Sequence, residues 1–437
     1  MKKNNIFFSL SLVILLVLSY TLTASERKET KEVYSVERII KSTTQIYFEN
    51  KTGSLKVETW EKNSVKVDLF ITVDGDNDQV QKILDCIKKI QFDQKGDQVT
   101  FDTRFYKCMT GQIPGHFKVV LLDGSTVKLT RLDISFIITM PKNNPFSLKQ
   151  AYENATLPDL NGNVILDLYE CELIAGQLPN CRQIKMKYGK GVIDSVQNVN
   201  LNLYENNLIL KHAGNVTLNS KYSEIKMYNS GSMNIDSYED KISVLQHGDL
   251  FIRAKYTFFT LTDFSKATFD IYECTVKAGT GNIIAVGAKY CNLEFNTCKA
   301  IVFTESYENK FAAGFVGDIK ASSNYSAYEI YHLDGNFNFL NSYEDQIKIN
   351  EIGKKFTGIT MTGKYSEIRM SFETGTAYKL DVDLEYTDFD FMKETFQELR
   401  YHKEEDKFQF IGVTQGSEVN TIPLVKINMY EGEIKLK

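Results

Sequence analysis

The stretch that decides the fold is YENNLILKHAGNVTLNSKYSEIKMYNSGSMNIDSYED, residues 204–240. Two adjacent positions in it recur every 17 residues, and successive copies carry Tyr-Glu and Lys-Tyr alternately. A short fixed period indicates an internal repeat, in which each copy folds into the same small unit. The recurring pairs continue beyond this stretch and are Tyr204-Glu205, Lys221-Tyr222, Tyr238-Glu239, Lys255-Tyr256, Tyr272-Glu273 and Lys289-Tyr290.

Apolar residues keep the same register as these pairs. Leu201 and Leu218 occupy one position of the repeat, and Leu208 and Ile225 occupy another. Apolar and polar residues alternate within each copy, which is typical of short strands with one buried face. Such a copy is too short for strand–helix–strand units, and a propeller blade needs about 40 residues. The sequence therefore predicts an all-β fold, a single-stranded parallel β-solenoid (β-helix) whose coils of ~17 residues stack about 4.8 Å apart.

The repeat begins near residue 151 of the 437-residue chain, so we expect the solenoid to span residues 151–437. Residues 25–150 are predicted to form a β-rich N-terminal region with one amphipathic helix at 76–90. At the other end, Val425–Lys437 is predicted to be the final coil, whose lysines would discourage end-to-end pairing of sheets. The apolar residues with helical spacing in the N-terminal region are Val80, Ile83, Leu84 and Ile87.

Residues 1–24 have the features of a secretory signal peptide. Lys2 and Lys3 precede the uncharged stretch Ile6–Thr23, and small residues follow it. An uncleaved N-terminal anchor is the alternative, because these 18 residues approach the length that spans a bilayer. No second long apolar run follows, so we expect no integral membrane segment after cleavage. The predicted location is periplasmic, at the outer surface or extracellular.

The composition offers little for catalysis or for nucleic-acid binding. Lys and Arg number 51 against 56 Asp and Glu, a net charge of −5 without the basic excess that recruits nucleic acid. The seven cysteines form no CxxC motif, and the five histidines lie in dissimilar contexts. We therefore expect small buried cysteines, no metal site, no cofactor and no catalytic residue. A polysaccharide-active β-helix enzyme remains a less favoured alternative.

The recurring pairs are the candidate binding residues, and they also have a structural explanation. In a parallel in-register ladder, alternating Tyr with Lys or Glu separates like charges and permits contact between Lys and a Tyr ring. We favour this structural explanation, while an exposed aromatic and charged ridge would also suit a sugar or a protein surface. The candidate binding residues are Tyr204, Lys221, Tyr222, Tyr238, Lys255, Tyr256, Tyr272, Lys289 and Tyr290.

Several segments resemble a known group of proteins. They are Asn50–Gly53 with the following SLKVETWEKNSVKVDLFITV, the segment VQKILDCIKKI, ISFIITMP at 134–141 and KYSEIKM at 221–227. With them the chain resembles the secreted bacterial putative-adhesin families, including the putative auto-transporter adhesin head domain. The chain departs from the family pattern where Tyr-Glu and Tyr-Ser replace Tyr-Gly at the coil corners. The resemblance implies surface adhesion and no catalytic residue.

The sequence thus predicts an exported, non-enzymatic protein of the cell envelope or cell surface. Adhesin-like binding of a glycan or a protein through the solenoid surface is the expected activity. A structural or assembly protein of the envelope that needs no ligand is the alternative.

Overall fold

The computed structural model describes residues 29–113, 116–417 and 422–437, so the signal peptide expected at 1–24 lies outside the described residues. The chain forms two compact units, each made of several segments. The boundary expected at residue 150 does not coincide with this division, because segments before it pair with the first coils of the solenoid. Of the described residues, the smaller unit comprises those within 29–32, 71–89 and 105–133, and the larger one those within 33–70, 90–104 and 134–437.

The smaller unit contains the one α-helix among the described residues, α1 (Asn77–Ile87). It lies where the apolar spacing predicts it and is three residues shorter at its C-terminal end, where Lys88 caps it. Its buried residues are Val80, Ile83, Leu84 and Ile87, as the helical spacing requires. No helix in the described part of the chain has the length and apolar content needed to span a bilayer.

Antiparallel strands accompany the helix in this unit. β7 (Tyr106–Ile113) pairs with β8 (His116–Leu121), and β8 pairs with the first part of β9 (Thr126–Pro141). Strands β1 (Thr30–Ile39) and β4 (Ser64–Gly75) each have residues in both units.

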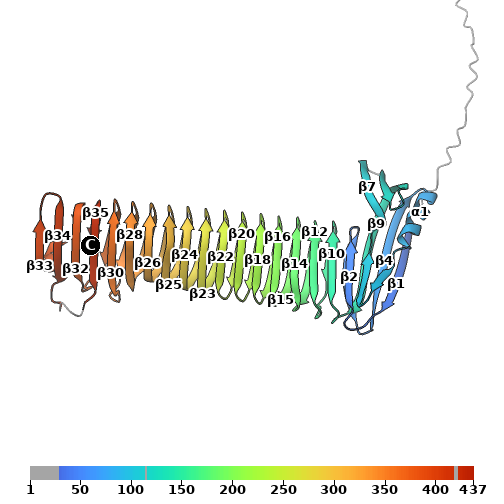
Figure 1. Cartoon of the computed structure of the whole chain (residues 1–437), viewed down its shortest axis with the longest axis horizontal. Helices are drawn as coiled ribbons and strands as arrows, with labels where there is room; N and C mark the ends of the chain where they lie inside the picture. Colours follow the sequence, from blue (N-terminus) through green and yellow to red (C-terminus); the bar gives the residue numbers. More distant parts are fainter. Residues whose placement is uncertain (1–28, 114–115, 418–421) are drawn as a thin grey trace, which may run out of the picture. The chain divides into compact units, whose positions relative to one another are not determined.

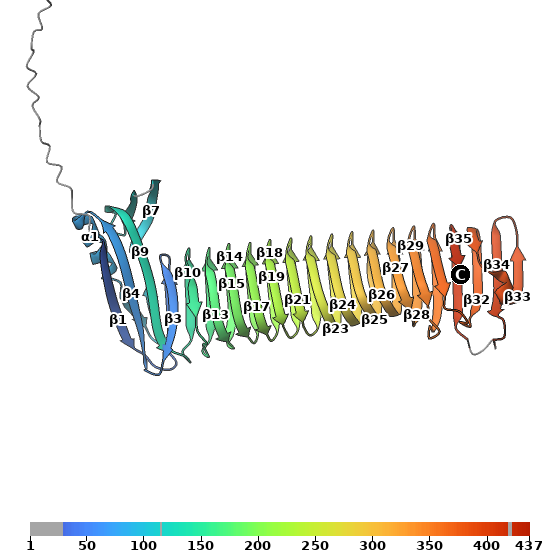
Figure 2. The ribbon, with the colours of Figure 1, turned by 180° about the vertical axis from the view of Figure 1, so that it is seen from behind.

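The larger unit is a parallel β-solenoid, which confirms the predicted fold class. Each coil contributes one strand to a first sheet, turns, and contributes one strand to a second sheet. In the first sheet Leu201 pairs with Leu218, and in the second Leu208 pairs with Ile225, so the 17-residue register is present. Figure 1 and Figure 2 show the stacked strands from the two sides. Inward side chains such as Leu218 and Ile225 are buried and form one core between the sheets.

The central coils have short strands in both sheets. In the first sheet these are β10 (Phe146–Ala151), β12 (Val164–Tyr169), β14 (Cys181–Lys187), β16 (Val199–Tyr204), β18 (Val216–Lys221), β20 (Met233–Tyr238) and β22 (Leu250–Lys255). In the second sheet they are β11 (Ala155–Leu157), β13 (Glu172–Leu178), β15 (Lys190–Val196), β17 (Asn207–Ala213), β19 (Glu224–Asn229) and β21 (Lys241–Gln246).

Farther along, single long strands run from the second sheet into the first sheet of the following coil. Their pairing keeps the 17-residue offset between β23 and β24, and farther along the offset varies between 17 and 22 residues. These strands are β23 (Phe258–Tyr272), β24 (Thr275–Lys289), β25 (Asn292–Tyr307) and β26 (Lys310–Asn324), followed by the shorter β27 (Ala327–Leu333), β28 (Asn336–Tyr343), β29 (Gln346–Ile352), β30 (Gly358–Lys364) and β31 (Glu367–Phe372).

The first coils of the solenoid are built from the N-terminal part of the chain. β10 pairs in parallel with β2 (Gln45–Asn50), which pairs with β6 (Gln98–Asp102). β11 pairs with β3 (Ser54–Trp60), which pairs with the last part of β9. β5 (Phe92–Lys95) pairs antiparallel with β6.

The C-terminal end differs from the expectation that Val425–Lys437 is the final coil. β35 (Leu424–Leu436) inserts between the coil of β30 and β31 and strand β32 (Lys379–Asp390). β34 (Lys407–Thr414) then pairs antiparallel with β32, and β33 (Phe396–Lys403) pairs antiparallel with β34 after a short 3₁₀ turn at Lys393–Thr395. The outer strand is therefore β33, whose exposed side chains include charged residues that discourage strand pairing between molecules.

Candidate binding surface: a tyrosine ridge

The turn from the first sheet to the second carries one continuous row of aromatic side chains, which we call the tyrosine ridge. Neighbouring rings touch edge to face, with centroids 5.4–6.0 Å apart and interplanar angles of 73–87°. This is a favoured geometry for aromatic pairs. The members, in order of contact, are Tyr152, Tyr169, Tyr188, Tyr204, Tyr222, Tyr238, Tyr256, Tyr272, Tyr290, Tyr307, Tyr325, Tyr343, Tyr365, Tyr430 and Tyr386.

The ridge zigzags because the tyrosines alternate between two neighbouring positions of the turn. Tyr204 ends a strand of the first sheet, and Lys221 and then Tyr238 lie above it in register. The ring of Tyr222, one place later in the turn, fills the gap between the rings of Tyr204 and Tyr238. The alternation of Lys and Tyr within one column is as expected from the sequence. The contact between rings of adjacent columns is an additional feature.

The second position of each turn has an unusual backbone conformation. Fifteen non-glycine residues of the ridge turns have φ between 48° and 68°, in the left-handed region. All are Tyr or Glu, for example Tyr222 (φ 57°) and Glu239 (φ 53°). A side chain at such a position costs roughly 1–2 kcal/mol, and glycine avoids this cost. At the Tyr-Glu corners the residue that replaces Gly is the strained one, whereas at the Tyr-Ser corners the strained residue is the Tyr, for example Tyr222.

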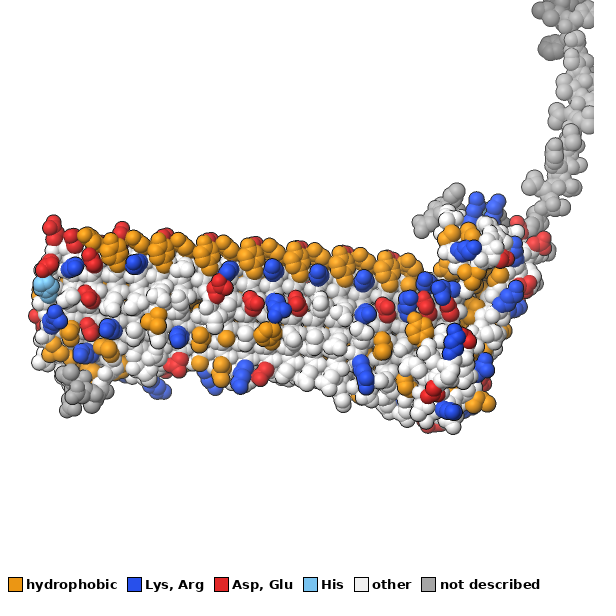
Figure 3. All heavy atoms as spheres, in the orientation of Figure 1, with side chains coloured by type: hydrophobic (Ala, Val, Ile, Leu, Met, Phe, Trp, Pro, Cys, Tyr) orange, Lys and Arg blue, Asp and Glu red, His pale blue; other side chains and the backbone are white. Residues whose placement is uncertain are grey.

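The ridge separates two kinds of charge. Lysines of the first position, such as Lys187 and Lys221, lie on the side of the first sheet, and Figure 3 shows basic side chains directly beside the ridge. Glutamates of the second position, such as Glu170 and Glu205, lie on the side of the second sheet. Among the described ridge residues, the expected contact of a lysine with a tyrosine ring is found at Lys364, whose Nζ lies 5.8 Å from the centroid of the Tyr430 ring, and not at Lys221, Lys255 or Lys289.

A ladder of buried polar side chains lies directly beneath the ridge. The residue after each left-handed position points inward and accepts a hydrogen bond from the backbone N–H of the same position in the preceding coil. Ser223 N–H, for example, donates to Asp240 Oδ1 at 2.7 Å. From Gly189 to Ser366, each turn is thus tied to the next by one hydrogen bond of a side chain. The ladder consists of Asn206, Ser223, Asp240, Thr257, Cys274, Cys291, Asn309, Ser326, Asp345 and Ser366.

Two members of this ladder are buried carboxyl groups. The side chain of Asp240 accepts hydrogen bonds from Ser220 and Ser237, and that of Asp345 from Ser323 and Ser342. Burial raises the pKa of both carboxyl groups, although these hydrogen bonds act in the opposite direction. They hold the turns of the solenoid together from the inside and do not face solvent.

Cysteines occupy the ladder at two neighbouring coils. The backbone N–H of Cys274 donates to Sγ of Cys291 at 3.3 Å, and both thiols are free. The interaction between the two thiols lowers the pKa of Cys274 and raises that of Cys291. Of the seven cysteines five are buried, Cys86 is partly exposed and Cys108 is exposed.

Two grooves flank the ridge over the first coils. The groove on the first sheet has a volume of about 780 Å³, and that on the second sheet about 720 Å³. We call them the basic groove and the acidic groove after their charged residues. The basic groove contains Lys51, Lys149, Lys185, Lys187, Lys221 and Asp167. The acidic groove contains Glu170, Glu172, Glu205, Glu224 and Lys190.

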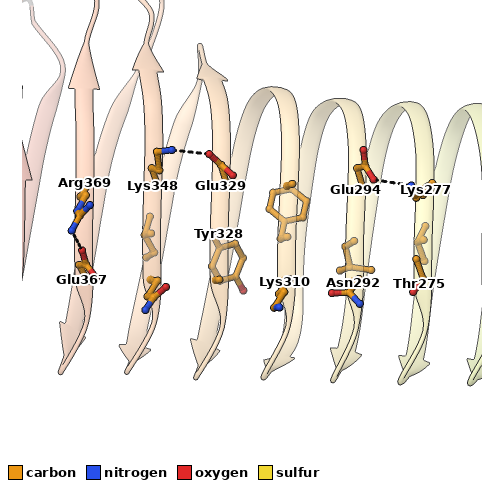
Figure 4. A pocket seen from close by; sticks show the side chains of 17 residues that line it. Thr275, Lys277, Asn292, Glu294, Lys310, Tyr328, Glu329, Lys348, Glu367 and Arg369 are labelled. Atoms are coloured by element: carbon orange, nitrogen blue, oxygen red, sulfur yellow. Dashed lines mark hydrogen bonds and ion pairs between the residues drawn. The ribbon is translucent and has the colours of Figure 1, made fainter.

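A third groove, of about 610 Å³, crosses the second sheet between β24 and β31 (Figure 4). Its carboxylates are paired with cations, since Glu294 lies 3.5 Å from Lys277 and Glu329 lies 2.8 Å from Lys348. The hydrogen bond from Lys348 also lowers the pKa of Glu329. No group of three or more potential metal-ligating side chains exists among the described residues.

The structure places all nine predicted binding residues on the ridge or its lysine flank. Tyr222, Tyr256 and Tyr290 each expose 42–43% of their surface, and the first-position tyrosines are partly buried. The sequence predicts the glutamate row as part of the charged ridge, but it does not predict that Lys51 and Lys149 lie beside it. The glutamates follow the same 17-residue register, which is enough to predict their position. Lys51 and Lys149, in contrast, come together only through long-range strand pairing.

No protein-family model and no curated protein matches the chain. Among solved structures, one described as a "putative cell adhesion protein" from Clostridium sporogenes is 9% identical, with 94% of this chain and 99% of that chain covered and a TM-score of 0.18. Another, described as a "putative lipid binding protein" from Parabacteroides distasonis, is 11% identical, with 93% and 96% covered and a TM-score of 0.15. Superpositions this poor carry no inference about function.

Proposed function

We propose that the protein is an exported, non-enzymatic protein of the cell envelope or cell surface that binds a glycan or a protein along the tyrosine ridge. The observation that carries this proposal is the left-handed backbone at fifteen ridge positions occupied by Tyr or Glu. Glycine would relieve roughly 1–2 kcal/mol at each of them. Backbone strain of this kind gathers where side chains serve a function.

The ridge also has the physical properties of a binding surface. Except at the two ends of the ridge, each exposed ring is held between two others, so little conformational entropy is lost when a ligand covers it. Exposed aromatic surface in a continuous row is a common mark of an interaction site. The row extends over many coils, which suits an extended ligand that contacts several rings at once (Figure 3).

A structural role in the envelope without any ligand is the second candidate. The ring contacts and the buried ladder both stabilise the solenoid, which is a sufficient reason for the turn sequences in a purely structural protein. Glu329 of the groove in Figure 4 favours neither candidate, but it does not suit the role of general acid in glycan cleavage. A general acid needs a raised pKa, whereas the pKa of Glu329 is lowered.

Glycan-array and protein-capture measurements test the proposal. The mature protein is compared with a variant carrying Tyr222→Ala, Tyr256→Ala and Tyr290→Ala. A matched control carries Tyr228→Ala and Tyr331→Ala, which remove tyrosines of similar exposure outside the ridge. Binding that is lost in the ridge variant and kept in the control supports the proposal. A folded ridge variant that binds as well as the control would support the structural role instead.

A further inference from the structure

The basic groove carries a net positive charge. Five lysines and one aspartate line it, together with rings of the ridge. Lys149 is engaged by Glu49 at 3.0 Å. Lys185, Lys187 and Lys221 are exposed, and no carboxylate of the described residues lies within ion-pair distance of them. The groove therefore holds positive charge that the folded chain itself does not neutralise.

The spacing of two of these lysines is regular. Lys187 pairs with Tyr204 and Tyr204 with Lys221, so the two ammonium groups are two coils apart with a tyrosine between them. Two coils correspond to about 10 Å along the stack. One sugar ring in an extended polysaccharide spans nearly the rise of one coil. A polysaccharide with an anionic group on every second sugar therefore matches the order Lys, Tyr, Lys, with a sugar beside the ring and a charge beside each lysine.

We infer that the basic groove binds an acidic polysaccharide that carries about one anionic group per two sugars, aligned along the ridge. The inference rests on the proposed function and specifies its ligand class. Nucleic acid fits less well, because its phosphates follow one another at every unit, and the glutamate row beyond the ridge repels a dense polyanion. The chain as a whole is also acidic, with a net charge of −5.

Lysine–anion contacts in an open groove predict a salt-dependent affinity. Exposed charges are screened over about 8 Å at physiological ionic strength. Binding should therefore weaken as salt rises, whereas stacking of neutral sugars on the rings should change little. This difference separates the groove from a purely aromatic mode of binding at the same ridge.

Calorimetric titration of the mature protein with four probes tests the inference. Hyaluronan oligosaccharides carry one carboxylate per two sugars, polygalacturonate carries one per sugar, chito-oligosaccharides are neutral, and single-stranded DNA is a polyphosphate. We expect hyaluronan to bind more tightly than the other three and to bind more weakly in higher salt. Absence of hyaluronan binding, or equal binding of the neutral probe, would overturn the inference. Tighter binding of DNA would favour a nucleic-acid surface instead.

A charge-reversal variant locates the site. Lys185→Glu, Lys187→Glu and Lys221→Glu together should weaken hyaluronan binding by at least about tenfold. The control variant Lys266→Glu, Lys310→Glu and Lys320→Glu has the same net charge and alters exposed lysines outside the groove. An equal loss of hyaluronan affinity in the groove variant and the control variant would overturn the assignment of the site to the basic groove. If charge reversal prevents folding, the three Lys→Gln changes at the groove replace it.

The outcome for the inference is distinct from that for the proposed function. A neutral glycan or a protein that depends on the ridge tyrosines, and is unaffected by the groove variant, would leave the proposed function standing and refute the acidic ligand. If the unchanged protein binds no ligand along the ridge, both the proposed function and the acidic-polysaccharide inference are refuted.

Discussion

Replacing ridge glutamates by glycine should make the protein more stable, contrary to the usual effect of glycine in a strand-rich protein. The test variant carries Glu205→Gly, Glu239→Gly and Glu273→Gly, at φ values of 51°, 53° and 49°. All three side chains are exposed, so little packing is lost with them. Relief of the left-handed conformation contributes about 1–2 kcal/mol per site. The greater chain entropy of glycine in the unfolded state takes back about 0.5–1 kcal/mol.

The net gain is therefore about 0–1.5 kcal/mol per site, and about 2 kcal/mol for the triple variant at the middle of that range. The sites are two coils apart and share no partner, so their effects should add. Urea unfolding, with the slope of the transition compared between variants, measures the gain. Amide hydrogen exchange in the substituted coils complements it, because repeat proteins open locally as well as globally.

Glu172→Gly is the matched control. Glu172 is exposed on β13 and is not among the left-handed residues, so glycine there should lower the stability by roughly 0.5–1 kcal/mol. Opposite signs at Glu239 and Glu172 are the expected result. If Glu239→Gly is destabilising to the same extent as the control, the ridge glutamates are not strained and the observation behind the proposed function loses its force. If the triple variant is more stable and no longer binds, the glutamates are retained for binding.

Three further outcomes are expected. Tyr256→Phe keeps both ring contacts and should leave urea stability within about 0.5 kcal/mol. Tyr256→Gly loses two contacts of about 0.5–1.5 kcal/mol each but also relieves the left-handed conformation at φ 57°, so it should be less stable than Glu239→Gly; equal stability of the two glycine variants would show that the ring contacts contribute nothing. Burial raises the folded-state pKa of Asp240 and Asp345 above the ordinary value of 3.8. Between this ordinary value and the folded-state pKa the folded state binds more protons than the unfolded state, so the free energy of unfolding falls as pH rises through that interval. In the variant with Asp240→Asn and Asp345→Asn, the urea midpoint should no longer fall as pH rises through this range. A pH dependence equal to that of the unchanged protein would contradict the prediction. A maleimide should label exposed Cys108 rapidly and buried Cys298, whose thiol pKa burial raises, only on unfolding; similar rates would contradict the burial.

The repeat could be predicted because its residues recur at a short, fixed spacing along the sequence. The pairing of Leu201 with Leu218 follows directly from a 17-residue offset, and so does the column of Tyr204, Lys221 and Tyr238. The expected helix was found for the same reason, since its apolar spacing lies within one short segment. Periodic features need no knowledge of distant pairing, which is why they are readable from one sequence.

The features that escaped prediction depend on contacts between distant segments or on backbone conformation. The insertion of β35 before β32 reverses the chain order at the C-terminal end and has no periodic signature. Lys51 joins the basic groove because β2 pairs with β10 about a hundred residues later. The edge-to-face contacts of the ridge depend on a left-handed residue in each turn, where Glu and Tyr are unfavourable by propensity.

The alternation of Tyr-Glu with Lys-Tyr has consequences for both stability and binding. If every coil carried Tyr-Glu, glutamates would stack about 4.8 Å apart and repel one another. The rings would also stack within one column rather than meet edge to face across two. The two-coil period avoids both, and it leaves lysines on one side of the rings and glutamates on the other. The structural and the binding explanations of the ridge are therefore compatible. They differ in one respect that experiment can resolve, because only a binding ridge loses a ligand when Tyr222, Tyr256 and Tyr290 are replaced by Ala.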